Sequence, residues 1–181
     1  MKPVIGVIGP AKSEYPKNPK LVVRLEKETE EVGMLLAKSG AFVLTGGMDG
    51  VMEIVCRGAK LGGGTTIGTP GRTRGLSNKY VDIEILTPID TGDFLFAGSW
   101  TSDSMIVFPG GAGTLAELCL GYRLGKSMVI MEGYDPYYDR LVGNFMDNGK
   151  TVRLLGASTP EKAVEMALAA ARQNIKKPGE L

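Results

Sequence analysis

The stretch Phe108 to Glu117, which reads FPGGAGTLAE, decides how this chain can fold. It follows the apolar run Met105 to Phe108 and opens a helical pattern that continues to about Gly125, so its glycines fall at a strand-to-helix turn. Glycines at such a turn let backbone N–H groups approach an anion closely, and the helix that follows presents unpaired N–H donors and the positive end of its dipole. The pattern predicts a phosphate site, and the residues expected to bind the phosphate are Gly110, Gly111, Gly113 and Thr114.

Further apolar runs of the strand type lie on both sides of this stretch, with helical patterns between them. They are continuous rather than alternating, which suits strands buried on both faces. The expected strands are Val4 to Ile8, Phe42 to Leu44, Thr65 to Ile67, Ile83 to Leu86, Met105 to Phe108, Met128 to Met131 and Val152 to Leu155. The expected helices are Pro19 to Ser39, Gly50 to Leu61, Thr91 to Ser102, Thr114 to Leu124, Pro136 to Asn148 and Pro160 to Gln173.

This alternation predicts an α/β fold, namely a doubly wound, Rossmann-like domain with a mostly parallel sheet of about seven strands and helices on both faces. We expect residues 1–175 to form a single domain and residues 176–181 to be a frayed tail. Ligands of such sheets gather beyond the carboxyl ends of the strands, where most of the glycine-rich loops would lie.

Three other loops are expected to share that rim with the signature loop. They are Gly9 to Ser13 (GPAKS), Thr45 to Gly50 (TGGMDG) and Pro70 to Gly75 (PGRTRG). The candidate nucleotide-binding residues in them are Gly9, Ser13, Gly46, Gly47 and Arg72. Each has a plainer interpretation, because a glycine pair also makes a tight turn, and Arg72 and Arg74 could be solvated cations rather than phosphate ligands. Asp49 is placed to cap the helix beginning near Gly50.

Thr114 and Glu117 allow two interpretations. T-x-x-E is the spacing of a capping box, in which each side chain would bond the backbone amide of the other residue. Alternatively, the hydroxyl of Thr114 contacts a phosphate and Glu117 faces the ribose or the bond being broken. The two interpretations are partly compatible.

A competing motif overlaps the same loop. Gly111 to Ala116 fits the GxGxxA form of the dinucleotide fingerprint, and Glu132 lies 21 residues after Gly111, where an acid could bind a ribose hydroxyl. A dinucleotide-dependent enzyme is therefore an alternative. Against it, the fingerprint normally occupies the first βαβ unit, whereas here it follows four expected strands.

Composition narrows the function further. The 181 residues carry 21 basic and 20 acidic side chains, a net charge of +1, which gives no electrostatic reason to expect nucleic-acid or membrane binding. No apolar run approaches the roughly 20 residues of a membrane span, and the start lacks a signal-peptide pattern, so a cytoplasmic protein is expected. The chain has no histidine, which argues against a Ser-His or Cys-His hydrolase. Its two cysteines lack CxxC spacing, so no metal site is expected.

With TGGMDGVME and PGGAGTLAE in view, the chain resembles the Lonely Guy (LOG) superfamily, once widely labelled lysine decarboxylase-like, whose signature is PGGxGTxxE. The resemblance covers most of the chain, from VIGVIG through LGKSMVIM. It is strongest to the branch of Rossmann-type nucleotide-binding proteins that includes the molybdenum cofactor carrier protein. The segment Pro70-Gly71, with Asn78, Tyr80 and Asp82 after it, looks like a pattern of that branch.

The resemblance implies that the signature glycines and Thr114 bind phosphate. It also implies that Glu117 would assist cleavage of an N-glycosidic bond in the hydrolytic members, which release a base and ribose 5-monophosphate from cytokinin-type nucleotides or AMP. Those members pair this glutamate with an arginine just before the signature strand, in an MHxRK motif. Here residues 91–104 read TGDFLFAGSWTSDS, without Lys or Arg. A cation that would stabilise negative charge is therefore missing unless Arg72 or Arg74 replaces it.

The leading hypothesis is a carrier or sensor that binds a phosphorylated, nucleotide-like molecule without strong catalysis. The alternative is a nucleoside 5′-monophosphate phosphoribohydrolase that acts through Glu117. A lysine decarboxylase is not supported, because no lysine lies in a recognisable pyridoxal phosphate context. The ligand could be an AMP-like nucleotide or the molybdenum cofactor, and the resemblance implies a homodimer or a higher homo-oligomer.

Overall fold

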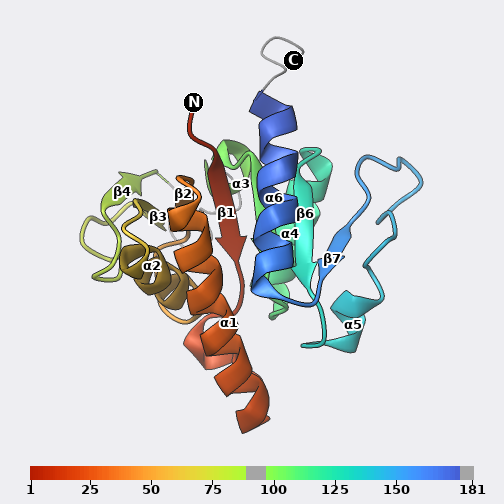
Figure 1. The fold of residues 1–181 in the computed structure, drawn as a ribbon, viewed down its shortest axis with the longest axis horizontal. Helices are drawn as coiled ribbons and strands as arrows, with labels where there is room; N and C mark the ends of the chain where they lie inside the picture. Colours follow the sequence, from red (N-terminus) through yellow and green to blue (C-terminus); the bar gives the residue numbers. More distant parts are fainter. Residues whose placement is uncertain (89–96, 176–181) are drawn as a thin grey trace.

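A computed structural model describes residues 1–88 and 97–175, whose strands form one seven-stranded sheet (Figure 1). The strands are β1 (Val4–Ile8), β2 (Phe42–Thr45), β3 (Thr66–Gly71), β4 (Ile83–Leu86), β5 (Ser104–Val107), β6 (Ser127–Met131) and β7 (Leu155–Ala157). Their order across the sheet is β4-β3-β2-β1-β5-β6-β7, and every neighbouring pair is parallel. The predicted Rossmann-like α/β fold is confirmed.

Helices cover both faces of the sheet. Those described are α1 (Pro19–Lys38), α2 (Val51–Leu61), α3 (Ala97–Thr101), α4 (Ala112–Arg123), α5 (Pro136–Asp139) and α6 (Pro160–Ile175), with a short 3-10 turn, η1 (Lys12–Glu14), after β1. One face carries α1, α2 and α6, and the other carries α3 and α4 (Figure 1). Among the described helices, none is long and apolar enough to cross a membrane.

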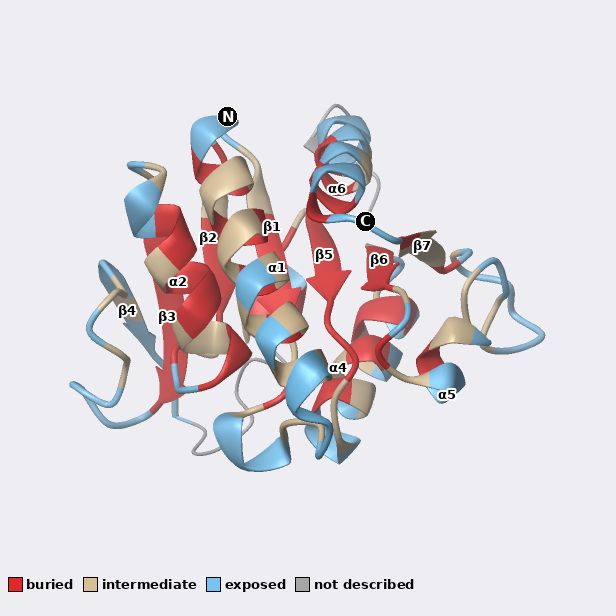
Figure 2. Cartoon of the chain, turned by 60° about the horizontal axis from the view of Figure 1, so that its bottom comes forward, coloured by how far each residue is buried: buried red, intermediate tan, exposed pale blue. Residues whose placement is uncertain are grey.

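The core has two layers, one on each side of the sheet, because successive strand residues point to opposite faces. Ile5 and Val7 of β1 pack with α1, α2 and α6, whereas Ile8 packs in the layer beneath α4. Phe108, which opens the signature stretch, is fully buried. Figure 2 shows the buried strands in the middle of the sheet. The central strands therefore hold the loops that follow them on a rigid base.

Helices α1 and α2 meet at two glycines. A Cβ on Gly33 would collide with the carbonyl oxygen of Val55, and a Cβ on Gly58 would collide with the carbonyl oxygen of Glu30. The two backbones are therefore in direct contact, which only residues without a side chain allow. Beside this crossing, Arg57 of α2 bonds Glu30 of α1, with 2.6 Å between Nε and Oε1.

Several boundaries differ from the expected ones, among them the end of β3, which runs to Gly71 instead of Ile67. Strand β7 begins at Leu155, three residues after the expected start, because the backbone of Leu154 pairs with Gly143 and Asn144 instead of with the sheet. Helix α5 ends at Asp139 rather than near Asn148. Of the helix expected over residues 91–102, only α3 falls within the described residues.

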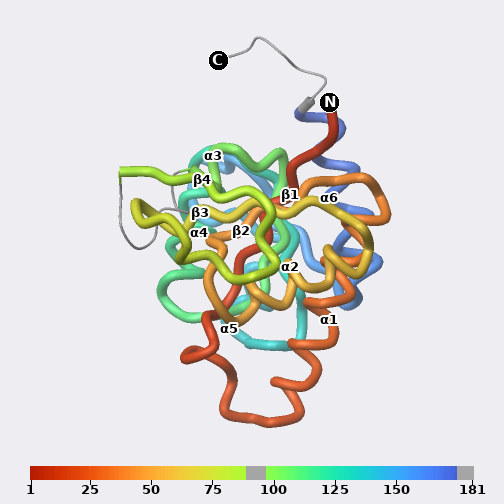
Figure 3. Tube along the Cα trace, turned by 90° about the vertical axis from the view of Figure 1, so that its left-hand side faces the viewer, coloured from red at the N-terminus to blue at the C-terminus, as the bar shows by residue number. Residues whose placement is uncertain are grey.

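The edge strand β4 departs from the expectation of strands buried on both faces. Ile83, Ile85 and Leu86 are 48%, 38% and 37% exposed. Figure 3 looks onto this edge, with β4 and β3 nearest the viewer. The strand reads IEIL, so Glu84 interrupts its apolar residues, and the pattern does not predict burial on both faces.

Candidate functional site

Strand β1 is the point of the sheet at which successive strands begin to be added on the opposite side. Strands β2, β3 and β4 follow one another on one side of β1, whereas β5, β6 and β7 follow on the other. In open parallel sheets this switch point leaves a crevice beyond the carboxyl ends of the strands, and ligands bind there. A cavity of about 140 Å³ lies at that place. Its walls are formed by Val7, Ile8, Gly9, Ala11, Glu14, Thr45, Gly46, Met52, Gly113, Thr114 and Glu117.

The cavity brings together the loops that follow β1, β2 and β5. Of the predicted site residues, those that line it are Gly9, Gly46, Gly113, Thr114 and Glu117. Gly47, Gly110 and Gly111 belong to the same loops but are not part of the cavity wall. Ser13 is exposed on η1 and Arg72 is exposed just after β3, and neither lines the cavity.

The signature loop forms the start of α4. Gly111 is the N-cap residue of this helix, and no side chain caps it. The first N–H groups of the helix therefore lack intrahelical partners. A Cβ built on Gly113 would meet nothing within 4 Å, so the space beside this residue is open. The hydroxyl of Tyr138 supports the loop from behind by donating to the carbonyl oxygen of Gly110 at 3.1 Å.

The capping-box interpretation is wrong. Helix α4 begins at Ala112, so Thr114 lies inside its first turn instead of at the N-cap. Thr114 is 2% exposed, and its hydroxyl lies over Gly110, where a Cβ would be 2.5 Å from Oγ1. Glu117 lies a further turn along and faces the cavity. The two side chains are free of the capping role and belong to the cavity wall.

Glu117 is an unusual carboxyl group. Burial, with a smaller contribution from the nearby carboxylate of Glu14, raises its pKa to about 8. A carboxyl with such a pKa keeps its proton at neutral pH and can donate a hydrogen bond or the proton itself. Strong perturbation inside a cleft is typical of functional groups.

Sequence reasoning missed Glu14 and Met52 as cavity residues, and it placed Thr45 in a site loop without naming it as a binding residue. Glu14 follows the predicted Ser13 directly, and no spacing rule marks it, because η1 is a short turn without a sequence signature. The carboxylate of Glu14 reaches the signature loop, since a Cβ on Gly111 would lie 2.8 Å from its Oε1. Thr45 is fully buried, and its hydroxyl has no hydrogen-bond partner.

The second loop is held by a side chain from another part of the chain. The Nδ2 group of Asn78 donates to the carbonyl oxygens of Gly47 and Met48, at 2.9 Å each, and its backbone N–H donates to Gly47 at 2.7 Å. The position of Asp49 suggested that it caps α2, but it does not cap this helix. Its carboxylate accepts from the backbone N–H of Lys12 at 3.1 Å and ties η1 to this loop.

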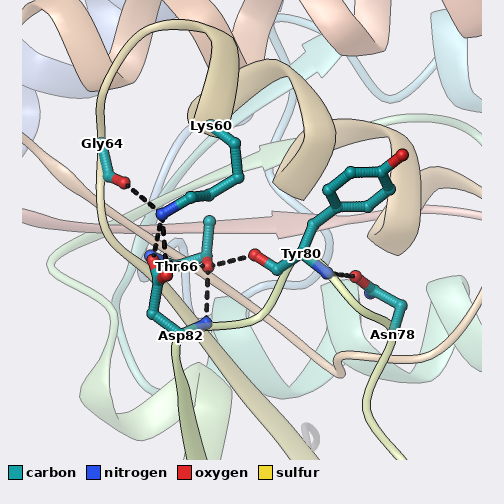
Figure 4. Close-up of polar contacts among 6 residues, drawn as sticks. All are labelled: Lys60, Gly64, Thr66, Asn78, Tyr80 and Asp82. Atoms are coloured by element: carbon teal, nitrogen blue, oxygen red, sulfur yellow. Dashed lines mark hydrogen bonds and ion pairs between the residues drawn. The ribbon is translucent and has the colours of Figure 1, made fainter.

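Asn78 is fixed in turn by a polar network at the edge of the sheet (Figure 4). Its side-chain oxygen accepts from the N–H of Tyr80, whose carbonyl oxygen accepts from the Thr66 hydroxyl at 2.6 Å. Asp82 bonds both Thr66 and the ammonium group of Lys60. Burial alone would raise the pKa of Asp82, but the bonds from Lys60 and Thr66 outweigh it and lower that pKa. The residues resembling the family pattern thus support the site rather than line it.

The arginines of the third loop lie apart from the cavity. This loop is folded by Glu84, whose carboxylate accepts from the backbone amides of Gly75 and Ser77. A separate cavity of about 400 Å³ lies between the second loop and the segment after the third; it is lined by Met48, Asp49, Glu53, Leu76, Asn78 and Lys79. Among the residues lining the first cavity there is no Lys or Arg. The cation missing from the sequence motif is not replaced in its wall.

One further expectation concerns an acid after β6. Glu132, the acid of the alternative dinucleotide fingerprint, lies at the end of β6 with its carboxylate beside Gly156 of β7, where a Cβ would be 2.9 Å from Oε2. It is not part of the cavity wall. The geometry therefore gives the dinucleotide interpretation no support.

Comparison with known proteins agrees with this fold. The sequence profile of the SLOG cluster4 family matches residues 2–164. The structure determined as structural genomics target TM1055 is 31% identical, with a TM-score of 0.81 over 93% of this chain and 99% of that one. The molybdenum cofactor binding protein from Rippkaea orientalis is 29% identical, with a TM-score of 0.76 over 93% of this chain and 97% of that one.

Two more relatives extend this picture. The molybdenum cofactor carrier protein from Chlamydomonas reinhardtii is 29% identical, with a TM-score of 0.76 over 98% of this chain and all of that one. An uncharacterised protein of Archaeoglobus fulgidus is 33% identical over 108 residues, which are 56% of this chain and 71% of the relative. The similarity thus spans bacterial, algal and archaeal proteins.

Proposed function

Because this chain belongs to the SLOG cluster4 family, we propose that it binds a phosphorylated, nucleotide-like small molecule and carries or senses it without strong catalysis. The observation that supports this most is the convergence of the loops after β1, β2 and β5 on one cavity at the switch point, with the uncapped start of α4 in its wall. Backbone N–H groups at a helix start favour a phosphate whatever is attached to it. The chain's place of action in this proposal is the cytoplasm.

The ligand is an AMP-like nucleotide or the molybdenum cofactor. The second choice draws on two relatives that are described as binding or carrying that cofactor. Both carry a phosphate, which is the group that the backbone amide donors at the start of α4 would bind. The molybdenum cofactor would supply redox chemistry to an acceptor enzyme, whereas this chain would only bind the phosphate of the cofactor.

Glu117 favours one alternative, a nucleoside 5′-monophosphate phosphoribohydrolase. A carboxyl with a pKa of about 8 can protonate the departing base at neutral pH as the N-glycosidic bond breaks, and the resulting carboxylate can accept a proton from the water that adds to the sugar carbon. The wall of the cavity, however, offers no cation to hold the phosphate or offset developing negative charge. We therefore place binding ahead of hydrolysis.

Native mass spectrometry of freshly purified protein tests the proposal, because a carried ligand would appear as added mass. The same protein is then incubated with AMP, and the products are separated by chromatography to look for adenine and ribose 5-phosphate. A bound, uncleaved ligand supports the carrier. Release of adenine that disappears in Glu117→Gln supports the hydrolase, whereas failure to bind any phosphorylated compound contradicts both.

We further propose that the chain forms a homo-oligomer and that one apolar groove of its surface forms the contact between subunits. The groove, of about 380 Å³, is lined by Ala97, Trp100, Thr101, Leu120 and Leu124, and Trp100 is 64% exposed. An exposed aromatic side chain beside half-buried leucines is typical of contacts between proteins. The carbonyl oxygens of Trp100 and Ser102 both accept from the ammonium group of Lys126 at 2.8 Å, which fixes the end of α3.

A further inference from the structure

The peptide group between Gly110 and Gly111 is the part of the signature loop whose own residues constrain it least. Neither residue has a Cβ, so the plane of this peptide can rotate with little steric cost. Its carbonyl oxygen and its N–H point in opposite directions, because the peptide group is planar and trans. The orientation of the plane therefore decides which of the two is presented to a ligand.

Tyr138 makes a bond that fixes this plane. Its hydroxyl donates to the carbonyl oxygen of Gly110 at 3.1 Å. Burial raises the pKa of the Tyr138 phenol to about 12, so the group keeps its proton and remains a donor at neutral pH. Within residues 1–88 and 97–175, no other group donates to this carbonyl oxygen, and no acceptor bonds the N–H of Gly111. A single side-chain bond thus holds a peptide that its glycines leave free to rotate.

The bond directs the carbonyl oxygen away from the cavity. Tyr138 belongs to α5, which follows β6, and β6 lies on the opposite side of β5 from β1. The cavity lies on the side of β1, among the loops that follow β1, β2 and β5. A carbonyl oxygen that points toward α5 leaves the N–H of Gly111 pointing toward the cavity side, where an anion could accept its hydrogen bond. Rotation of the plane would instead turn the negative end of the peptide dipole toward that anion.

The position of Tyr138 is itself well determined. Its side chain is 2% exposed. The carboxylate of Asp135 caps the start of α5 by accepting from the N–H of Tyr137 at 2.7 Å, and Asp139 accepts from the N–H of Gly133 at 2.9 Å. A helix of four residues has little stability of its own, so these bonds are needed to hold it. The hydroxyl is therefore held at a fixed place behind the loop.

We propose that Tyr138 is a positioning residue, which orients the peptide between Gly110 and Gly111 so that the N–H of Gly111 is available to the phosphate of the ligand. This inference rests on the proposed function and deepens it, because it assigns a role in binding to a side chain outside the cavity wall. Since Tyr138 acts through the backbone, it supports the binding of any phosphorylated ligand and does not distinguish what is attached to the phosphate.

The test compares the binding of AMP and of inorganic phosphate to the wild-type chain, Tyr138→Phe and Tyr122→Phe by isothermal titration calorimetry. Tyr122→Phe is the matched control, because it also removes the hydroxyl of a buried tyrosine with a bond of 3.1 Å, here to Asp147, and Tyr122 does not line the cavity. Tyr138→Phe keeps the ring and should bind both compounds about tenfold more weakly, the scale of one hydrogen bond to a charged group. Tyr122→Phe should match the wild type.

A second readout separates the orientation of the peptide from a general loss of stability. In nitrogen-15 NMR spectra, addition of AMP should shift the amide signal of Gly111 in the wild type and in Tyr122→Phe, and should shift it less in Tyr138→Phe. An unaltered affinity or an unaltered Gly111 shift in Tyr138→Phe overturns the role of Tyr138, as does an equal loss of affinity in Tyr122→Phe. These outcomes leave the proposed function intact if the wild type binds AMP or phosphate. If the wild type binds neither, the proposed function fails and this inference fails with it.

Discussion

At the scale of single residues, a substitution of Gly113 is expected to weaken ligand binding without destabilising the fold. A Cβ here meets nothing within 4 Å, so Gly113→Val leaves the protein's own packing untouched while its methyl groups enter the space beside the amide donors. We expect affinity for AMP to fall at least about tenfold, with a melting temperature within a few degrees of the wild type. Ala116→Val, an exposed site one turn further along α4, is the control for valine's lower helix propensity. Unaltered affinity in Gly113→Val would remove the anion-loop assignment.

The carboxyl of Glu117 makes stability depend on pH. Its pKa is about 8 in the folded protein against an ordinary value of 4.5, so the folded state holds a proton that the unfolded state releases earlier. The stabilisation is complete below pH 4.5 and is lost as the pH rises toward 8. We expect the free energy of unfolding of the wild type to fall by roughly 2–4 kcal/mol relative to Glu117→Gln between pH 4.5 and pH 8.5. Urea unfolding at both pH values measures this difference. If the free energy of unfolding changes equally with pH in the two proteins, the pKa of Glu117 is not raised.

Moving from residues to elements, the loop after β2 depends on Asn78. Asn78→Ala removes the two bonds that Nδ2 makes to the carbonyl oxygens of Gly47 and Met48. We expect a loss of about 1–3 kcal/mol in the free energy of unfolding and weaker AMP binding, because Gly46 loses the support of its loop. Asn144→Ala is the control, since its Nδ2 also bonds two carbonyl oxygens but lies after α5, away from the cavity. Equal effects of the two substitutions on binding would contradict a supporting role for Asn78.

The order of the elements could be predicted because most strand runs are rich in apolar residues, as in the case of β1, whose bounds were predicted to the residue. The ends were harder to predict. The three residues before β7 look like a strand, but the backbone of Leu154 pairs with the segment after α5, and the pairing of Leu155 with Val129 of β6 sets the true start. Pairing between segments far apart in sequence leaves no local signal.

The same limit applies within the site. The glycine loops could be predicted because their residue types are dictated by local backbone geometry. Glu14 could not, because its place in the cavity depends on the direction that η1 takes after β1. Thr114 was ambiguous for a related reason, since T-x-x-E spacing is compatible with more than one helix start, and here α4 begins at Ala112.

For the molecule as a whole, one substitution tests whether the chain forms a homo-oligomer. Trp100→Glu places a charge in the apolar groove between α3 and α4. We expect the wild type to have the mass of a dimer or a higher oligomer and Trp100→Glu to shift toward the monomer, because desolvation of the carboxylate opposes association. Light scattering after size-exclusion chromatography measures both. Tyr137→Glu, at an exposed aromatic residue on α5, is the control. A monomeric wild type, or an oligomer unaffected by Trp100→Glu, would contradict the assigned face.

The contact of α1 with α2 at Gly33 and Gly58 also bears on how the two sides of the cavity move. The loop bearing Glu14 runs into α1, and the loop containing Gly46 runs into α2 (Figure 1). At these two glycines main chain meets main chain, so no side chain there can absorb a shift by changing its rotamer. Because this contact couples the two helices directly, we expect a ligand that displaces one of these cavity loops to shift the other with it.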